Sequence, residues 1–168
     1  MTDHIARSQL LLARLVTGLM AALVVGGIAW YGLAPETWVR VWNNLVDRPG
    51  GPFVFRFVLQ PVMATAAAWR DGLRDARAGR APFLRTVFTD PAQRRVRLDE
   101  ALVATSRIIL LGLAIDAVYQ FIQFRAFHPV EAVIIALLLA FVPYVLLRGL
   151  ITRIASGWFG DKSSGDPR

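Results

Sequence analysis

Cysteine is absent from this chain of 168 residues, and histidine occurs only twice, at His4 and His128. The absence of cysteine excludes disulfide bonds, thiolate metal sites, iron–sulfur clusters and cysteine nucleophiles. The two histidines are too far apart in the sequence to suggest a shared metal site. We therefore expect no bound metal and no cofactor.

Lysine is nearly absent as well, because Lys162 is the only lysine among the 19 basic residues and all the others are arginine. Two interpretations stay open. One is that these arginines bind phosphate groups, whose oxygens match the guanidinium fork. The other is a compositional bias of the genome toward arginine and alanine codons.

Charged residues make up only 18% of the chain, and hydrophobic residues make up 55%. A typical soluble domain has about 45–50% apolar and about 25% charged residues. The charges are also clustered, which leaves long uncharged runs between them. This composition predicts an all-α integral membrane helical bundle. We expect residues 1–156 to form a single membrane domain and residues 157–168 to form a disordered tail.

Four segments are predicted to be transmembrane helices: residues 15–33, 53–69, 101–124 and 130–147. A cleaved signal peptide is the alternative for the first segment, but Pro35 would follow the cut, which favours an uncleaved anchor. The second segment contains Arg56, Gln60 and Pro61, and a re-entrant hairpin is its alternative.

The segments between the spans carry signals for helix starts and stops. Residues 35–47 place two tryptophans on one face, which predicts an amphipathic helix in the membrane interface. Gly79 predicts a helix end, and we expect residues 80–89 to form a loop. Asp90 followed by Pro91 is typical of an N-cap and a first helical residue, so a helix is predicted from there through the third span.

The Arg-rich connector, residues 70–100, cannot enter lipid, because a charged side chain costs about 2.5–3.5 kcal/mol at a helix centre. If both termini and the connector share one side, that side carries 14 basic residues and the other side carries three. The positive-inside rule then predicts a multi-pass protein of the bacterial inner (plasma) membrane, with both termini and the connector in the cytoplasm. Without a crossing at 53–69, the N-terminus and the connector would lie on opposite sides.

A polar face on the third span carries the first set of candidate site residues. Asp116, Tyr119 and Gln123 lie on this face. In antiparallel spans, Asp116 has a depth similar to that of Gln60 in the second span, and Arg56 is long enough to reach inward. We expect Asp116 to point into the bundle and to contact Arg56 or Gln60, because an ionisable residue at such depth needs a partner. Three interpretations stay open: a structural clamp, an ion or proton path, and a substrate site. The clamp is favoured because we expect no second buried carboxylate or histidine to pass a proton on.

The connector supplies a second set of candidate residues, for docking anionic lipid or an acidic partner. An arginine near an anionic membrane surface contributes about 1 kcal/mol. The alternative is a solvated topogenic segment with internal Asp–Arg pairs. The residues are Arg70, Arg74, Arg77, Arg80, Arg94, Arg95 and Arg97.

The expected partners are the lipid bilayer, in particular anionic phospholipid, and further copies of the chain in a homo-oligomer or a larger membrane complex. Gly18, Ala22 and Gly26 form a small-residue face in the first span, which favours close helix packing. Nucleic acid is not an expected partner, because acidic residues interleave the arginines and no aromatic stacking platform accompanies them.

Enzyme motifs are incomplete or absent. Residues 71–77, DGLRDAR, match only the start of the CDP-alcohol phosphotransferase signature, with one extra residue and without its other aspartates and later glycine. The P-loop, H-E-x-x-H and G-x-S-x-G patterns are absent. We therefore expect that the protein is not an enzyme.

Three strings, RFVLQP at 56–61, RDGLRDARAGR at 70–80 and DAVYQ at 116–120, resemble those of a family of short uncharacterised bacterial inner-membrane proteins. The resemblance implies an inner-membrane location and no activity. From the residues themselves, the leading hypothesis is a non-enzymatic accessory or scaffolding component of the membrane. A small transporter or channel subunit that uses Asp116 is the second hypothesis, and a membrane-embedded enzyme is the third.

Overall fold

The computed structural model describes residues 2–32, 35–47 and 54–160, and the regular elements in these ranges are all helices. This confirms the all-α prediction. The elements, in chain order, are α1 (Thr2–Tyr31), α2 (Pro35–Asp47), α3 (Arg56–Arg77), α4 (Phe83–Thr89), α5 (Pro91–Phe124), α6 (Pro129–Ala136), the π-helix η2 (Leu137–Phe141) and α7 (Val142–Gly160).

Within the described ranges, three helices are long and apolar enough to cross a membrane: Arg7–Tyr31 in α1, Pro91–Phe124 in α5, and Pro129–Trp158 through α6, η2 and α7. They correspond to the predicted first, third and fourth spans. The predicted second span at 53–69 is not among them. Its helix, α3, begins with a charged residue and continues into the charged connector as far as Arg77.

Several helix boundaries differ from those that the sequence predicts. The loop prediction for 80–89 is wrong, because α4 forms there and buries Phe83 and Thr86 against the bundle. Helix α7 continues to Gly160, so the first residues of the expected tail are helical, and residues 161–168 lie outside the described residues.

Two local signals are confirmed. Asp90 caps α5, since its side chain accepts hydrogen bonds from the backbone N–H groups of Ala92 and Gln93. Gly79 has a φ of +63°, the left-handed conformation that ends a helix at low cost for glycine.

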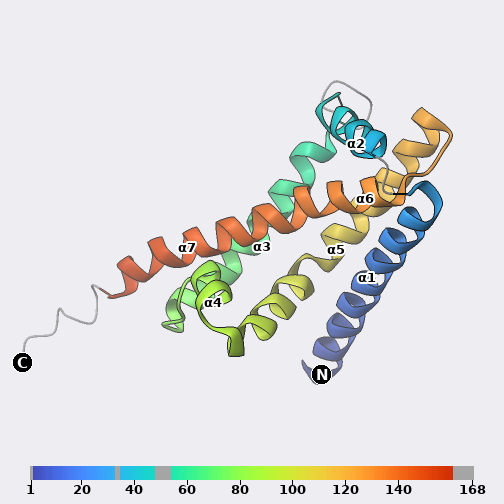
Figure 1. Ribbon diagram of the computed structural model, residues 1–168. Coiled ribbons are helices and arrows are strands. Elements are labelled where there is room, and N and C mark those ends of the chain that lie inside the picture. The colour runs from blue at the N-terminus through green and yellow to red at the C-terminus, as the bar shows by residue number, and fades with distance from the viewer. Residues whose placement is uncertain (1, 33–34, 48–53, 161–168) are drawn as a thin grey trace, which may run out of the picture.

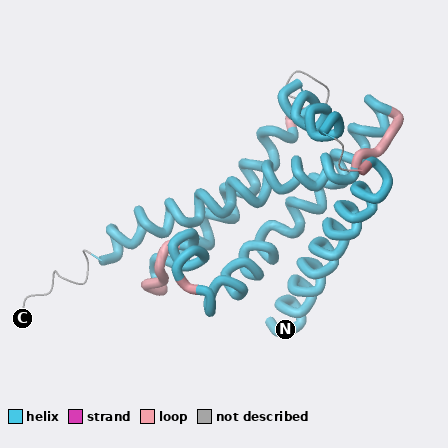
Figure 2. Tube along the Cα trace, in the orientation of Figure 1, coloured by secondary structure: helices cyan, strands magenta, loops and turns pink. Residues whose placement is uncertain are grey.

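The helices run back and forth along the molecule (Figures 1 and 2). α1 and α5 lie side by side and point in the same direction, and the Tyr31 hydroxyl at the end of α1 donates a hydrogen bond to the Phe127 carbonyl just after α5, at 2.8 Å. α3 runs the opposite way and packs along η2 and α7. α4 fills the end of the bundle between α5 and α7.

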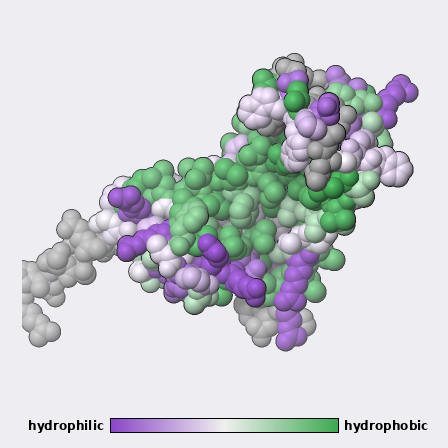
Figure 3. Space-filling view, viewed as in Figure 1, coloured by the Kyte–Doolittle hydropathy of each residue, from purple (hydrophilic) through white to green (hydrophobic). Residues whose placement is uncertain are grey.

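The interior contains many polar residues beside a core of alanines and larger apolar residues such as Phe83 and Ile109, while many other large apolar side chains face outward. Among the described residues, twelve that are polar or charged are buried, including Arg56, Asp116 and Arg148. Val25, Val58 and other large apolar residues are more than half exposed. Figure 3 shows the apolar surface across the middle of the molecule, with hydrophilic residues toward its ends. This arrangement suits a hydrocarbon environment, where polar groups must find partners inside the protein.

Close packing between α3 and α7 depends on small residues. Ala64 and Ala68 on α3 are fully buried. One turn further on, a Cβ atom added to Gly72 would lie 2.8 Å from Ile151 Cγ2 and 3.1 Å from the Arg148 carbonyl oxygen. By contrast, a Cβ at Gly18 or Gly26 would meet nothing within 4 Å, so the small-residue face of α1 is open in the described part of the chain.

Substitution of Gly72 by alanine should therefore lower the free energy of unfolding by about 1–3 kcal/mol, the usual cost of overpacking a close contact. Thermal unfolding in detergent measures the change. The matched control is Gly18→Ala, which should stay within about 0.5 kcal/mol of the wild type. Equal melting temperatures for the two variants would contradict the close approach of α3 and α7.

Candidate functional site

A buried ion pair joins α3 to α5 in the apolar part of the bundle. Arg56 Nη1 donates to Asp116 Oδ1 at 2.5 Å, and the two side chains are 2% and 0% exposed. The expected pairing of Arg56 with Asp116 is thus confirmed. Two charges buried together in this way cost less than either charge alone.

Gln120 extends this pair into a hydrogen-bonded chain. Its Nε2 donates to Asp116 Oδ2 at 2.5 Å, and its Oε1 accepts from the backbone N–H of His128 at 2.5 Å. The chain therefore runs from α3 through α5 to the residue before α6. From periodicity, Gln120 lies only at the margin of the polar face, but it takes the central position. We call Arg56, Gln60, Asp116 and Gln120 the Asp116 cluster.

The other residues expected on this face have different positions. Tyr119 is buried, but Gln123 is exposed, so its expected place in an interior path is wrong. The reason is that α5 continues past the bundle: the chain turns at Arg125, whose φ is positive, and packing resumes only with α6. Gln123 thus lies on an unpacked final turn.

Gln60 is fully buried, and neither its amide nitrogen nor its amide oxygen has a hydrogen-bond partner among the described residues. It packs against Gly112, where a Cβ atom would collide with the Gln60 amide nitrogen. Glycine at position 112 therefore makes room for this side chain on α5. A buried amide without partners costs about 1–3 kcal/mol.

Glu131 corrects another expectation. It is fully buried in the first turn of α6, so the bundle does contain a second buried carboxylate besides Asp116. The signal in the sequence was its position after His128-Pro129, at a helix N-terminus that favours an acidic residue. The preference of a helix N-terminus for an acidic residue does not indicate that Glu131 is buried. Its burial results from packing of α6 against α1 and α5.

A second, larger cluster lies at the end of the bundle where α4 packs. Asp75 accepts hydrogen bonds from Arg148 Nε at 2.8 Å and from Arg97 Nη1 at 3.0 Å, and Arg80 Nη1 lies 3.5 Å away. Glu100 accepts from Arg148 Nη2 at 2.7 Å and from Arg80 Nη1 at 3.3 Å. We call Asp75, Glu100, Arg80, Arg97 and Arg148 the Asp75 cluster.

Arg148 is the most connected member of this cluster. Its third nitrogen, Nη1, donates to the Tyr144 hydroxyl at 3.1 Å, and that hydroxyl donates to Asp71 Oδ2 at 2.7 Å. The guanidinium also stacks over the Phe83 ring, 5.0 Å from its centroid. Burial alone would raise the pKa of Asp75, but its hydrogen bonds and charge interactions with Arg148 and Arg97 hold that pKa below its ordinary value of 3.8.

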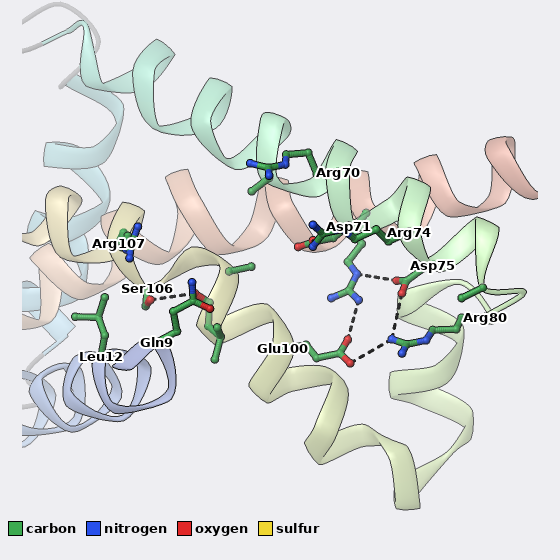
Figure 4. Close-up of a pocket in the computed structure, with 15 residues that line it drawn as sticks. Gln9, Leu12, Arg70, Asp71, Arg74, Asp75, Arg80, Glu100, Ser106 and Arg107 are labelled. Carbon is green, nitrogen blue, oxygen red and sulfur yellow. Dashed lines mark hydrogen bonds and ion pairs between the residues drawn. The ribbon is translucent and has the colours of Figure 1, made fainter. Parts of the chain in front are cut away.

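Beside the Asp75 cluster, a cleft of about 690 Å³ opens between α1 and α3 over the surface of α5 (Figure 4). We call it the basic cleft, because five arginines and three carboxylates line it. The arginines are Arg70, Arg74, Arg80, Arg107 and Arg148, and the carboxylates are Asp71, Asp75 and Glu100. Leu12, Ala67, Val103 and Ala104 give it an apolar wall.

The candidate arginines of the connector separate into three groups in the structure. Arg70, Arg74 and Arg80 line the basic cleft, whereas Arg97 is buried in the Asp75 cluster. The remaining three, Arg77, Arg94 and Arg95, are exposed elsewhere. Two arginines outside the connector, Arg107 and Arg148, were missed as site residues. Arg107 could have been found as the only basic residue in the predicted third span.

This arrangement is suited to holding anions. In the described ranges, no group of three or more histidine, aspartate and glutamate side chains could hold a metal ion. The acidic residues of the cleft already contact arginine or tyrosine, which leaves cationic and apolar groups facing the open space. Comparison of the chain with protein-family models, with curated proteins and with solved structures finds no match.

We expect that Arg56→Met and Asp116→Leu each destabilise the protein by about 3–5 kcal/mol, because each leaves a buried charge without its partner. The double variant should be more stable than either single variant, since both charges are removed together. Thermal unfolding of the four proteins in detergent completes the double-mutant cycle. A double variant as unstable as the sum of the two single changes would refute the pair as a structural clamp.

Substitution of Asp75 by asparagine should lower the free energy of unfolding by about 3–5 kcal/mol at pH 7, because Arg148 and Arg97 lose their charged partner. Because the pKa of Asp75 is lowered in the folded protein, its ionised carboxylate stabilises the fold at pH values above about 3.8, the ordinary pKa that it has in the unfolded chain. This stabilisation is lost as the pH falls below that value. The gap between wild type and variant should therefore narrow between about pH 4 and pH 2.

The control for this titration is Asp99→Asn, which removes an exposed carboxylate from the same end of α5. It should leave the free energy of unfolding nearly unchanged both at pH 7 and between about pH 4 and pH 2. A gap between the wild type and Asp75→Asn that stays constant down to pH 2 would show that the ionised carboxylate is not what holds the cluster together.

Proposed function

We propose that this protein is a non-enzymatic accessory component of the bacterial inner membrane that spans the bilayer four times and binds anionic phospholipid at its cytoplasmic end. Four crossings are supported by the direction of the helices. α1 and α5 begin at one end and finish together, joined by the contact of Tyr31 with Phe127. The chain between them must return to the starting end, and α3 is the helix that makes this return.

The surface of α3 fits a crossing. Its bundle face is small or polar, from Arg56 through Ala64 and Ala68 to Asp75. Its outer face carries exposed apolar residues, including Val58, and a polar helix face would be expected there in water. Its 22 residues extend about 33 Å, which is long enough to carry residues 56–69 through the bilayer and to leave residues 70–77, the start of the Arg-rich connector, at the membrane surface. Arg56 enters the bilayer already paired with Asp116.

The orientation follows from the basic residues. The end of the bundle that contains the starts of α1 and α5 and the end of α3 also contains the Arg-rich connector. By the positive-inside rule, this end faces the cytoplasm, together with both termini. The cytoplasmic leaflet is the one whose anionic lipids attract such arginines.

The observation that carries the lipid proposal is the division of the arginines into paired and unpaired sets. Arg97 and Arg148 are buried against Asp75 and serve the fold. Several arginines at or near the same end are exposed and make no ion pair with any described residue, among them Arg70, Arg85, Arg95 and Arg107. Their charge is available to phosphate groups outside the protein.

A non-enzymatic role is supported by the hydrogen bonds that the carboxylates of the two clusters accept. The carboxylates of Asp75, Glu100 and Asp116 all accept hydrogen bonds from buried arginine or glutamine side chains. Such saturated groups hold helices together and have little capacity left to move a proton.

A small transporter or channel subunit is the second candidate, favoured by buried Glu131 and by the amide of Gln60 in the Asp116 cluster, which has no hydrogen-bond partner among the described residues. This candidate predicts that an ion or solute enters vesicles that contain the protein and that Asp116→Asn abolishes this flux. The accessory function predicts no such flux.

The lipid proposal predicts that the purified protein retains phosphatidylglycerol in preference to phosphatidylcholine from an equimolar mixture, because each unpaired arginine near the headgroups contributes about 1 kcal/mol. Native mass spectrometry counts the lipids that remain bound. The preference should weaken at high salt, which screens exposed charges. Equal retention of the two lipids at low salt would eliminate the proposal.

A further inference from the structure

The basic cleft is a built site rather than a random grouping of charges. Its walls come from α1 and α3 and its floor from α5, and the Asp75 cluster closes one end. The carboxylates that line it are engaged: Asp75 and Glu100 with buried arginines, and Asp71 with the Tyr144 hydroxyl. Asp71 also forms an ion pair with Arg74, whose Nη1 lies 3.6 Å from Asp71 Oδ1. The cleft therefore offers net positive charge to an incoming group.

Arg107 gives this charge an unusual position. It lies seven residues beyond Glu100 on α5, which places it about 10 Å further along the helix, inside the apolar part of the chain. It is exposed and makes no ion pair with a described residue. An unpaired arginine at such a place in a membrane helix is costly unless it reaches an anion at the interface. The phosphate of a lipid is the anion found at this depth.

The remaining lining of the cleft suits the rest of a lipid molecule. Leu12 on α1, Ala67 on α3 and Val103 and Ala104 on α5 form an apolar wall beside the arginines. Small side chains at two of these positions leave room for a chain of methylene groups. Trp69, next to Arg70, is more than half exposed, as is common for tryptophan at a membrane interface.

We propose that the basic cleft holds one anionic glycerophospholipid, with its phosphate bound by Arg70, Arg74 and Arg107 and the start of an acyl chain against Ala67 and Val103. This inference rests on the proposed function and sharpens it, since it replaces general attraction to anionic lipid by a single stoichiometric site. Arginine suits this role because its planar fork donates two hydrogen bonds to phosphate oxygens at once.

Native mass spectrometry of the full-length protein titrated with phosphatidylglycerol tests the site. The wild type should retain one lipid more firmly than all others as collision energy rises. The variant with Arg70→Gln and Arg107→Gln should bind that first lipid about tenfold or more weakly, since it loses charged hydrogen bonds to the phosphate. Neither arginine is part of the Asp75 cluster, so the double variant should fold, which its melting temperature verifies.

The matched control is Arg85→Gln with Arg95→Gln, which removes the same charge from exposed positions outside the cleft. It should leave the first lipid bound and reduce only the weaker ones. A further variant, Ala67→Phe, fills the apolar wall without changing the charge and should also weaken the first lipid. Equal loss in the two arginine pairs would overturn the single site while leaving the proposed function intact.

Competition separates a lipid from a free anion. Inorganic phosphate and glycerol 3-phosphate at millimolar concentration should fail to displace the first phosphatidylglycerol, because neither fills the apolar wall. Displacement by either compound as effective as that by added lipid would show that the cleft takes a soluble phosphate instead. Equal binding of phosphatidylglycerol and phosphatidylcholine by the wild type would remove both the site and the proposed function.

Discussion

The carboxylate of Asp75 accepts hydrogen bonds from Arg148 on α7 and Arg97 on α5, and the rest of the bundle depends on this meeting point. The three groups are almost fully buried, so none of them can leave the cluster without exposing an unpaired charge to the interior. The contact fixes α3 against α7 where Gly72 allows the closest approach. The cluster also engages the carboxylates beside the basic cleft in ion pairs, so the neighbouring exposed arginines are able to attract anions.

A hydrocarbon environment explains why polar residues gather inside this protein. Lipid tails offer no hydrogen-bond partner, so a polar side chain must find its partner within the bundle. Arg56, Asp116 and Gln120 satisfy this requirement in the apolar middle, and the Asp75 cluster satisfies it at the end. Apolar side chains such as Val25 and Val58 then face outward. The two clusters hold α3 against its neighbours near its start, at Arg56, and near its end, at Asp75.

Local signals and strong periodicity were sufficient to predict much of the fold. The cap at Asp90, the stop at Gly79 and the long helix that follows Pro91 depend on neighbouring residues, and each is present. The pairing of Arg56 with Asp116 was also predictable, because few partners exist at that depth. Other contacts between residues far apart in sequence were not predictable: Asp75 meets Arg148 across 73 residues, and Glu131 is buried by helices that its own surroundings do not reveal. Gln120, and not Gln123, contacts Asp116, because the chain turns at Arg125 and the last turn of α5 is not packed against the bundle.

We propose that α3 crosses the membrane and brings the Asp75 cluster and the basic cleft to the cytoplasmic side. Reporter enzymes that are active only in the periplasm test this most directly when fused after Thr86, after Ala126 and after Ser156. We expect the reporter to be active after Ala126, in the connection between α5 and α6, and inactive after Thr86 and Ser156. Activity after Thr86 would mean that α3 does not cross, and the four-span arrangement would have to be abandoned.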